Sequence, residues 1–136
     1  MGIYLGSQAN SGSLFRASRA GNMRYMKELV EKFSYNPRLI KDGHGKTALH
    51  HASKHGRIEA VKFLIEKCHC DPDTQDNSGW TALDYAAEEK HEDIVQYLVE
   101  KCKATITDGI IRYAKPLKMK AYLREQQKKQ GRNQNQ

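Results

Sequence analysis

The sequence predicts an all-α fold built from stacked helix-turn-helix units that are joined by hairpin-like loops. A block of 34 or 35 residues recurs along the chain. Within each block, apolar residues follow the i, i+3, i+4 spacing of an amphipathic helix. Segments rich in Asp, Pro, Asn, Ser and Gly separate the blocks and are typical of turns. One block cannot bury its own apolar stripe, so the blocks must stack on one another.

The bulk composition favours one intracellular domain. The chain has 136 residues, of which 38% are apolar and 29% are charged, and this length suits a single packed domain. It has no apolar run long enough to span a membrane and no secretory signal pattern at its start. Three cysteines, an odd number, fit a reducing compartment. We therefore expect a cytoplasmic protein, with membrane association and the nucleus as alternative locations.

The net charge of +7 resides in the C-terminal segment. From Arg112 to the end there are eight basic residues and one acidic residue, Glu125, whereas residues 1–111 carry 15 of each sign. Attraction to an anionic partner would therefore come mainly from this segment.

The block Glu-Lys-Cys-His-Cys-Asp-Pro at 66–72 looks at first like a metal site. It aligns with Glu-Lys-Phe-Ser-Tyr-Asn-Pro at 31–37, however, so no set of ligands recurs. Adjacent Cys-His-Cys also lacks the gaps that let ligand pairs converge on a tetrahedral ion. We interpret the segment as the end of a helix followed by a turn, with no metal bound.

Each unit can be read in order from its local signals. Thr47 is placed to cap a first helix, and Gly56 to end it in a left-handed conformation. A second helix is expected from Ile58 to Lys67, with Ile58, Val61, Leu64 and Ile65 as its apolar stripe. The segment that follows is a turn-forming loop.

Residues 42–56, Asp-x-x-Gly-x-Thr-Ala-Leu-His-x-Ala-Ser-x-x-Gly, and the matching residues 76–87 resemble the ankyrin repeat signature. The resemblance covers about residues 14–107 and implies an ankyrin-repeat solenoid. Four departures from the family pattern stand out: Ala48 and Ala82 replace Pro, Asp84 replaces His, and Lys90 replaces Gly.

The resulting organisation has three parts. Residues 1–12 are expected to be a flexible leader and residues 126–136 a disordered basic tail. The repeat domain between them, residues 13–125, divides into units at approximately 13–41, 42–75 and 76–107 and a C-terminal cap at 108–125. The cap should pack a final helix through its apolar residues, which are Leu117, Met119, Ala121, Tyr122 and Leu123.

Catalytic and metal-binding functions find little support. His51 and His55 have the i, i+4 spacing of a metal pair, but no third ligand has a matching place. The resemblance instead gives His50 a structural role, bonded to the turn and to the signature Thr. No nucleophile motif or phosphate-binding loop is present. We therefore expect no enzyme activity and no cofactor.

The resemblance implies that the protein binds another protein through the concave face formed by hairpin tips and first helices. The groove should run from basic to acidic along the chain. Trp80, the only tryptophan, is either an interface anchor or a residue that packs on its neighbouring hairpin. The residues carried over to this face are Arg19, His44, Lys46, Lys54, His55, Asn77, Ser78, Trp80, Glu88 and Glu89.

We expect a monomer that acts as an adaptor, and two alternatives remain open. Gly2 follows Met1 and could accept a myristoyl chain, although the strict motif wants Ser or Thr where Gly6 stands. The basic tail would then supply a second attraction to an anionic membrane. Weak, sequence-independent nucleic-acid binding through the tail is the other alternative; specific recognition would require base-reading contacts that no motif here supplies.

Overall fold

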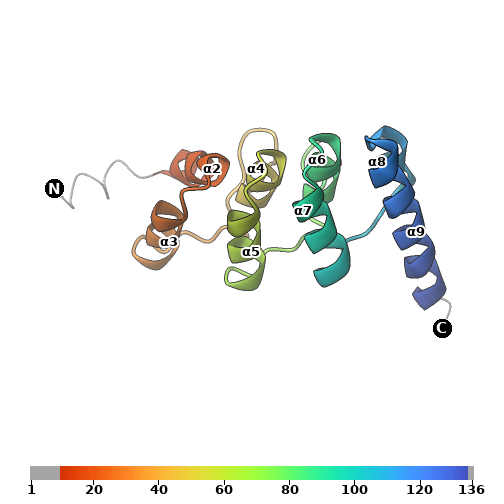
Figure 1. The fold of residues 1–136 in the computed structure, drawn as a ribbon. Coiled ribbons are helices and arrows are strands. Elements are labelled where there is room, and N and C mark those ends of the chain that lie inside the picture. Colours follow the sequence, from red (N-terminus) through yellow and green to blue (C-terminus); the bar gives the residue numbers. More distant parts are fainter. Residues whose placement is uncertain (1–9, 135–136) are drawn as a thin grey trace.

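In the computed structural model, which describes residues 10–134, every regular element is a helix, and the helices form a row of antiparallel pairs (Figure 1). This confirms the predicted all-α stack. The first helices of the pairs form one layer and the second helices form the other, with α2 and α9 at opposite ends of the row (Figure 1). The elements are α2 (Ser11–Ala20), α3 (Met23–Glu31), α4 (Ala48–Lys54), α5 (Ile58–Glu66), α6 (Ala82–Glu88), α7 (Glu92–Gln96), the π-helical turn η1 (Tyr97–Lys101), α8 (Asp108–Tyr113) and α9 (Leu117–Gln134).

The core runs the length of the row between the two layers. Small residues such as Ala52 and Ala86 on α4 and α6 are fully buried and let the first helices approach one another closely. Larger side chains from both layers fill the space between units, and those that are fully enclosed include Leu14, Met26, Leu29, Leu64, Leu83, Ile94, Leu98, Ile110 and Leu123. Of the predicted stripe on α5, Val61 and Leu64 are buried, whereas Ile58 and Ile65 pack at its margin.

Each second helix ends in the same left-handed turn. Ser34, His69 and Lys103 have φ between 55° and 58°, and the next residue donates its N–H back to the carbonyl six positions earlier, as Cys70 does to Leu64 at 3.0 Å. A left-handed residue ends each helix as in a Schellman motif, but the bond spans six residues instead of five. The Cys-His-Cys segment is therefore a helix-ending turn, as its alignment predicted.

The glycines that end the first helices also receive a side chain from the following unit. A Cβ on Gly56 (φ +73°) would lie 2.7 Å from Cε1 of His91, and His91 Nε2 lies 2.9 Å from the Lys54 carbonyl oxygen. Gly21 is covered in the same way by Arg57, whose Nε donates to the Arg19 carbonyl oxygen at 2.8 Å. At the equivalent position in the third unit stands Lys90, also left-handed with φ 64°.

We expect Gly56→Ala to destabilise the protein and Lys90→Gly to stabilise it. A left-handed residue with a Cβ costs about 1–2 kcal/mol, and at Gly56 the new methyl group must also displace the His91 ring. Lys90 is exposed, so its replacement by Gly removes only the backbone cost, a gain of about 1 kcal/mol. Urea unfolding of both variants measures the two effects. Equal and small changes would show that these turns are not strained.

The C-terminal segment differs from its prediction. Helix α9 extends to Gln134, so the expected disorder is wrong for residues 126–134. Gln130 Nε2 donates to the Ala104 carbonyl oxygen at 2.8 Å and its Oε1 accepts the Ile106 N–H at 3.2 Å, while Gln127 Nε2 donates to the Ile106 carbonyl oxygen at 3.1 Å. We call Gln127 and Gln130 the amide clasp. Composition alone hides this anchoring because both side chains are polar.

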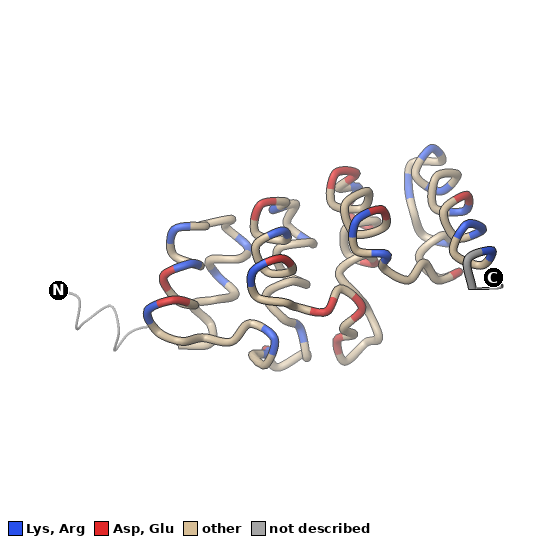
Figure 2. Tube along the Cα trace, turned by 90° about the horizontal axis from the view of Figure 1, so that it is seen from below, with Lys and Arg blue, Asp and Glu red and all other residues tan. Residues whose placement is uncertain are grey.

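Two other expectations change at the termini. Helix α2 begins at Ser11, two residues inside the predicted leader, because Asn10 and Ser13 form a capping box; Gly2 and the rest of residues 1–9 lie outside the described residues. In the cap, Met119 and Leu123 are buried as predicted, but Leu117 is 81% exposed. Lys and Arg outnumber Asp and Glu along this last unit (Figure 2).

Candidate functional site

The hairpin loops that precede α4 and α6 are held by one carboxylate each. Asp42 Oδ1 accepts the backbone N–H groups of His44 and Lys46, both at 2.9 Å, and Oδ2 lies 2.9 Å from His51 Nε2. Partial burial acts to raise the pKa of Asp42, but the hydrogen bonds it accepts bring the pKa below its ordinary value. These bonds fix the hairpin tip relative to the first helix and so place the side chains that the tip presents.

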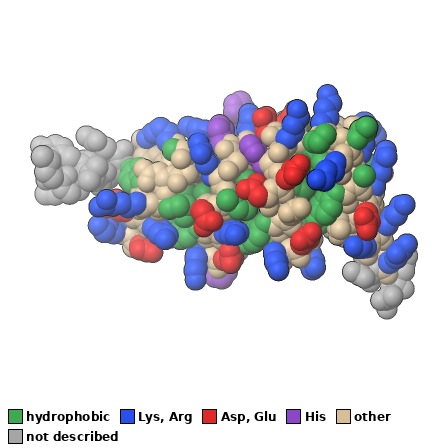
Figure 3. Space-filling model, in the orientation of Figure 1, with side chains coloured by type: hydrophobic (Ala, Val, Ile, Leu, Met, Phe, Trp, Pro, Cys, Tyr) green, Lys and Arg blue, Asp and Glu red, His purple; other side chains and the backbone are tan. Residues whose placement is uncertain are grey.

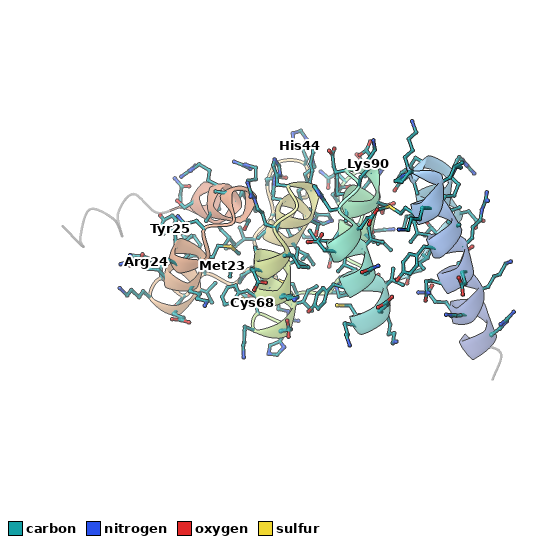
Figure 4. The ribbon with its side chains drawn as sticks, viewed as in Figure 1. Met23, Arg24, Tyr25, His44, Cys68 and Lys90 are labelled. Atoms are coloured by element: carbon teal, nitrogen blue, oxygen red, sulfur yellow. The ribbon has the colours of Figure 1, made fainter. Side chains whose placement is uncertain are left out.

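The second hairpin repeats this arrangement with a different partner. Asp76 accepts the N–H groups of Ser78 and Trp80 at 2.9 Å, and its other oxygen accepts the hydroxyl of Tyr85, the residue equivalent to His51. The Asn77 N–H donates to the His44 carbonyl oxygen at 3.0 Å, which joins the two tips. Figure 4 shows His44 and Lys90 at the same edge of the row.

The signature histidine joins one unit to the next. His50 is 2% exposed, its Nδ1 accepts the Thr47 N–H at 2.9 Å, and its Nε2 lies 2.9 Å from the carbonyl oxygens of both Thr74 and Trp80. With Nδ1 acting as an acceptor, the proton must sit on Nε2, where it serves the two carbonyls. The imidazole is therefore neutral and structural, as the resemblance implied.

Asp84 also joins its own helix cap to the next unit, but its carboxylate accepts hydrogen bonds where His50 donates one. Its Oδ2 accepts the Thr81 N–H at 2.7 Å and the Thr81 hydroxyl at 2.8 Å. A carboxylate has no proton to donate to a following hairpin, and the cap presents instead the hydroxyl of Tyr113, which donates to Asp84 Oδ1. His50 faces backbone carbonyl groups of the next unit, whereas Asp84 accepts a hydrogen bond from a hydroxyl group. The replacement of His by Asp at this position therefore matches the change of partner from carbonyl acceptors to a hydroxyl donor.

We expect the stability of the domain to fall as the pH drops below 6.5. Burial lowers the pKa of His50 and of His51 from 6.5, so the unfolded chain binds protons more readily than the folded chain. Stability is complete above pH 6.5 and declines toward the folded pKa, by at most about 1.4 kcal/mol per pH unit for each histidine. Urea titrations at a series of pH values test this. His50→Gln should reduce the pH dependence, whereas the same change at exposed His55 should not; equal slopes would contradict the assignment.

At three junctions between neighbouring first helices, a charged residue lies against a ring of the next unit. Arg19 Nη1 lies 3.4 Å from His51 Nδ1, and Lys54 Nζ lies 6.0 Å from the centroid of Tyr85. At the third junction the equivalent of Lys54 is Glu88, whose charge acts with that of Asp84 to raise the pKa of Tyr113, after the larger effects of burial and the Asp84 hydrogen bond. The face therefore runs from basic to acidic.

Trp80 lies between two aromatic rings. Its ring is parallel to that of Tyr113 within 3°, with centroids 5.1 Å apart, and its centroid is 5.0 Å from that of Tyr85. Trp80 is half-buried. Its packing partners thus include the first helix of the following unit, and one edge of the indole remains available to solvent.

The predicted site residues divide into two groups. Lys46, Lys54 and Trp80 meet around Tyr85, a residue that the sequence reasoning missed together with Tyr113. The repeat alignment could have identified Tyr85, because its equivalent His51 faces the same groove. The remaining predicted residues lie apart from this centre, at hairpin tips or at first-helix ends: Arg19, His44, His55, Asn77, Ser78, Glu88 and Glu89.

The cysteines show no sign of nucleophilic chemistry. Burial raises the pKa of Cys70 to about 12 and also raises the pKa values of Cys68 and Cys102, which keeps the thiols protonated near neutral pH. Cys68 lies beside α5 (Figure 4). Among residues 10–132, no three His, Cys, Asp or Glu side chains converge as metal ligands would. Within the described chain, no helix combines the length and apolar character needed to cross a bilayer.

Comparisons with known proteins agree with this architecture. The family model described as ankyrin repeats (3 copies) matches residues 14–108. A similar solved chain comes from the structure titled "Bd0816 Predatory Endopeptidase from Bdellovibrio bacteriovorus in complex with immunity protein Bd3460", with 30% identity and a TM-score of 0.64. The similarity covers 69% of this chain and 47% of that chain, so the present chain spans about half its length. The family model covers well over half of the sequence, and the chain therefore belongs to the ankyrin-repeat family.

Proposed function

We propose that the protein is a non-catalytic adaptor that binds another protein across the concave face. The observation that carries this proposal is the cluster of Lys46, Lys54 and Trp80 around Tyr85, which combines aromatic surface with unpaired charge on the hairpins and first helices. Aromatic residues beside charged ones are typical of interface centres. Membership of the ankyrin-repeat family supports a protein partner, and so does the origin of the similar solved chain in a complex of two proteins.

We expect Trp80→Ala to weaken binding of the partner by about 2 kcal/mol or more, because the exposed edge of the indole lies at the centre of the proposed interface. Affinity capture with quantitative mass spectrometry identifies the partner, and calorimetry then measures the dissociation constant. Since Trp80 also packs on Tyr113, the thermal transition of the variant must be measured in parallel.

Two further variants separate lost contacts from lost stability. Glu89→Lys reverses the charge of an exposed residue at the end of α6 without disturbing packing and should change the affinity. Tyr25→Ala, on α3 in the other layer, removes an aromatic ring away from the groove and should leave binding intact. Full binding by both groove variants, with loss in Tyr25→Ala, would move the interface to the layer of second helices.

A second candidate function concerns α9. Arg124, Lys128 and Arg132 are exposed at successive turns of this helix, so the basic residues form a stripe instead of a disordered tail. We propose this stripe as a contact for an anionic surface, which would assist the predicted lipid anchor at Gly2. Intact-mass spectrometry of protein from eukaryotic cells tests the anchor. An unmodified N-terminus, with a distribution that Gly2→Ala does not alter, would remove this candidate.

A further inference from the structure

We propose that Lys46 and Lys54 form an anion-binding site over Tyr85, and that the partner presents an acidic segment to it. This inference rests on the proposed function and specifies the chemistry of the partner. Lys46 comes from the hairpin of the second unit and Lys54 from the end of α4, yet both side chains reach the same ring. Their Nζ atoms lie 5.3 and 6.0 Å from the Tyr85 centroid.

The two ammonium groups retain their hydrogen-bonding capacity. A ring face attracts a cation but accepts no ordinary hydrogen bond, so each ammonium keeps donors for an acceptor from outside. The ion pairs among the described residues are Lys32–Glu28, His51–Asp42 and Lys129–Glu125, and neither lysine takes part in one. Two like charges held beside one ring repel each other, and an anion between them relieves that repulsion.

The acidic groups nearby are committed elsewhere or lie further along the groove. Asp76, below Tyr85, accepts the tyrosine hydroxyl and two backbone N–H groups. Asp42 is bound in the same way to its own hairpin and to His51. Glu88 and Glu89 are exposed at the end of α6, toward the third junction, and Glu88 is near enough for its charge to help raise the pKa of Tyr85, after the larger effects of burial and of Asp76. Glu88 therefore bounds the site on that side.

Arg19 extends the basic half of the groove toward the first unit. Its guanidinium lies against His51 and has no carboxylate partner among the described residues. Lys and Arg side chains line the upper edge of the molecule over the first units (Figure 3). An extended acidic segment that crosses α2, α4 and α6 would therefore meet Arg19, then the lysine pair, and would end before Glu88.

The site can be tested with a peptide that repeats Glu-Ser-Gly four times, titrated into the full chain at low ionic strength. Trp80 is the only tryptophan and lies 5.0 Å from Tyr85, so its fluorescence reports occupancy of the site. We expect a saturable change that Lys46→Gln/Lys54→Gln weakens about tenfold, since two ionic contacts are lost. Glu88→Gln should strengthen binding. A Gln-Ser-Gly repeat should give no change, and a phosphoserine version shows whether phosphate is preferred to carboxylate.

The matched control is Lys115→Gln/Lys118→Gln, which removes the same charge from exposed positions around the start of α9. It should leave the fluorescence titration unchanged. Loss of binding in this control, with retention in Lys46→Gln/Lys54→Gln, would place anion binding on α9 and overturn the proposal, as would the absence of any saturable signal. The proposed function is tested separately. If capture of the partner depends on Trp80 but not on the two lysines, the proposed protein-binding face is supported and the proposed anion site is wrong.

Discussion

Leu64→Ala is expected to destabilise the protein by about 2–5 kcal/mol. The Leu64 side chain is 0% exposed and lies among the fully enclosed residues between the two layers. Its removal loses the free energy of burial and leaves a cavity that fixed neighbouring helices cannot close. Domains of this size have about 5–15 kcal/mol of stability in total, so the variant should unfold at a much lower urea concentration or fail to fold.

Leu39→Ala is the matched control, because Leu39 is 76% exposed in the loop between α3 and α4. The same chemical change there should alter the free energy of unfolding by about 0.5 kcal/mol or less. Similar urea midpoints for the two variants would show that the buried Leu64 contributes no more to the free energy of unfolding than the exposed Leu39 does.

His50→Asp is expected to cost about 3–5 kcal/mol, although Asp occupies the equivalent position in the next unit. The new carboxylate can accept the Thr47 N–H, as Asp84 accepts the Thr81 N–H. It cannot donate to the Thr74 and Trp80 carbonyls, which His50 Nε2 now serves. Buried oxygens of like polarity would then face one another without a proton between them.

The same substitution at His55, which is exposed at the end of α4, is the control and should change stability little. Thermal unfolding of both variants at pH 7.5 or above (roughly one unit above the ordinary histidine pKa) excludes protonation effects. If His50→Asp is as stable as the parent, the bond to the next unit contributes little and the role of His50 is confined to its own helix cap.

The sequence was most informative where the same chemistry recurs in several units. Thr47 and Thr81 both cap a first helix, with the side chain of the residue three positions on completing the bond in each case. Such local signals depend only on residues within one turn of helix. Their recurrence at the same position in two units shows that they are not chance matches. The same comparison distinguishes the Cys-His-Cys turn from a metal site on the sequence alone.

The contacts between units were much less predictable. The stacking of Tyr113 on Trp80 and its bond to Asp84 depend on how closely the cap approaches the third unit. The lysines that meet on Tyr85 come from two different elements, and their meeting depends on the angle between hairpin and helix. The helix in residues 126–134 was missed because its anchoring residues are polar and the backbone groups that they bind are 21 and 26 residues away.

Lengthening this protein by design would require insertion of a unit inside the row, and appending one after the third unit would fail. Ala104 and Ile106 lie in the segment that links η1 to α8, and the amide clasp already occupies their backbone groups. A unit placed between the second and third repeats would instead meet hairpin tips that join through the Asn77 N–H and the His44 carbonyl oxygen. The clasp thus ties α9 to the segment that follows the third unit, and replacing both glutamines by Ala would leave those backbone groups without their side-chain partners.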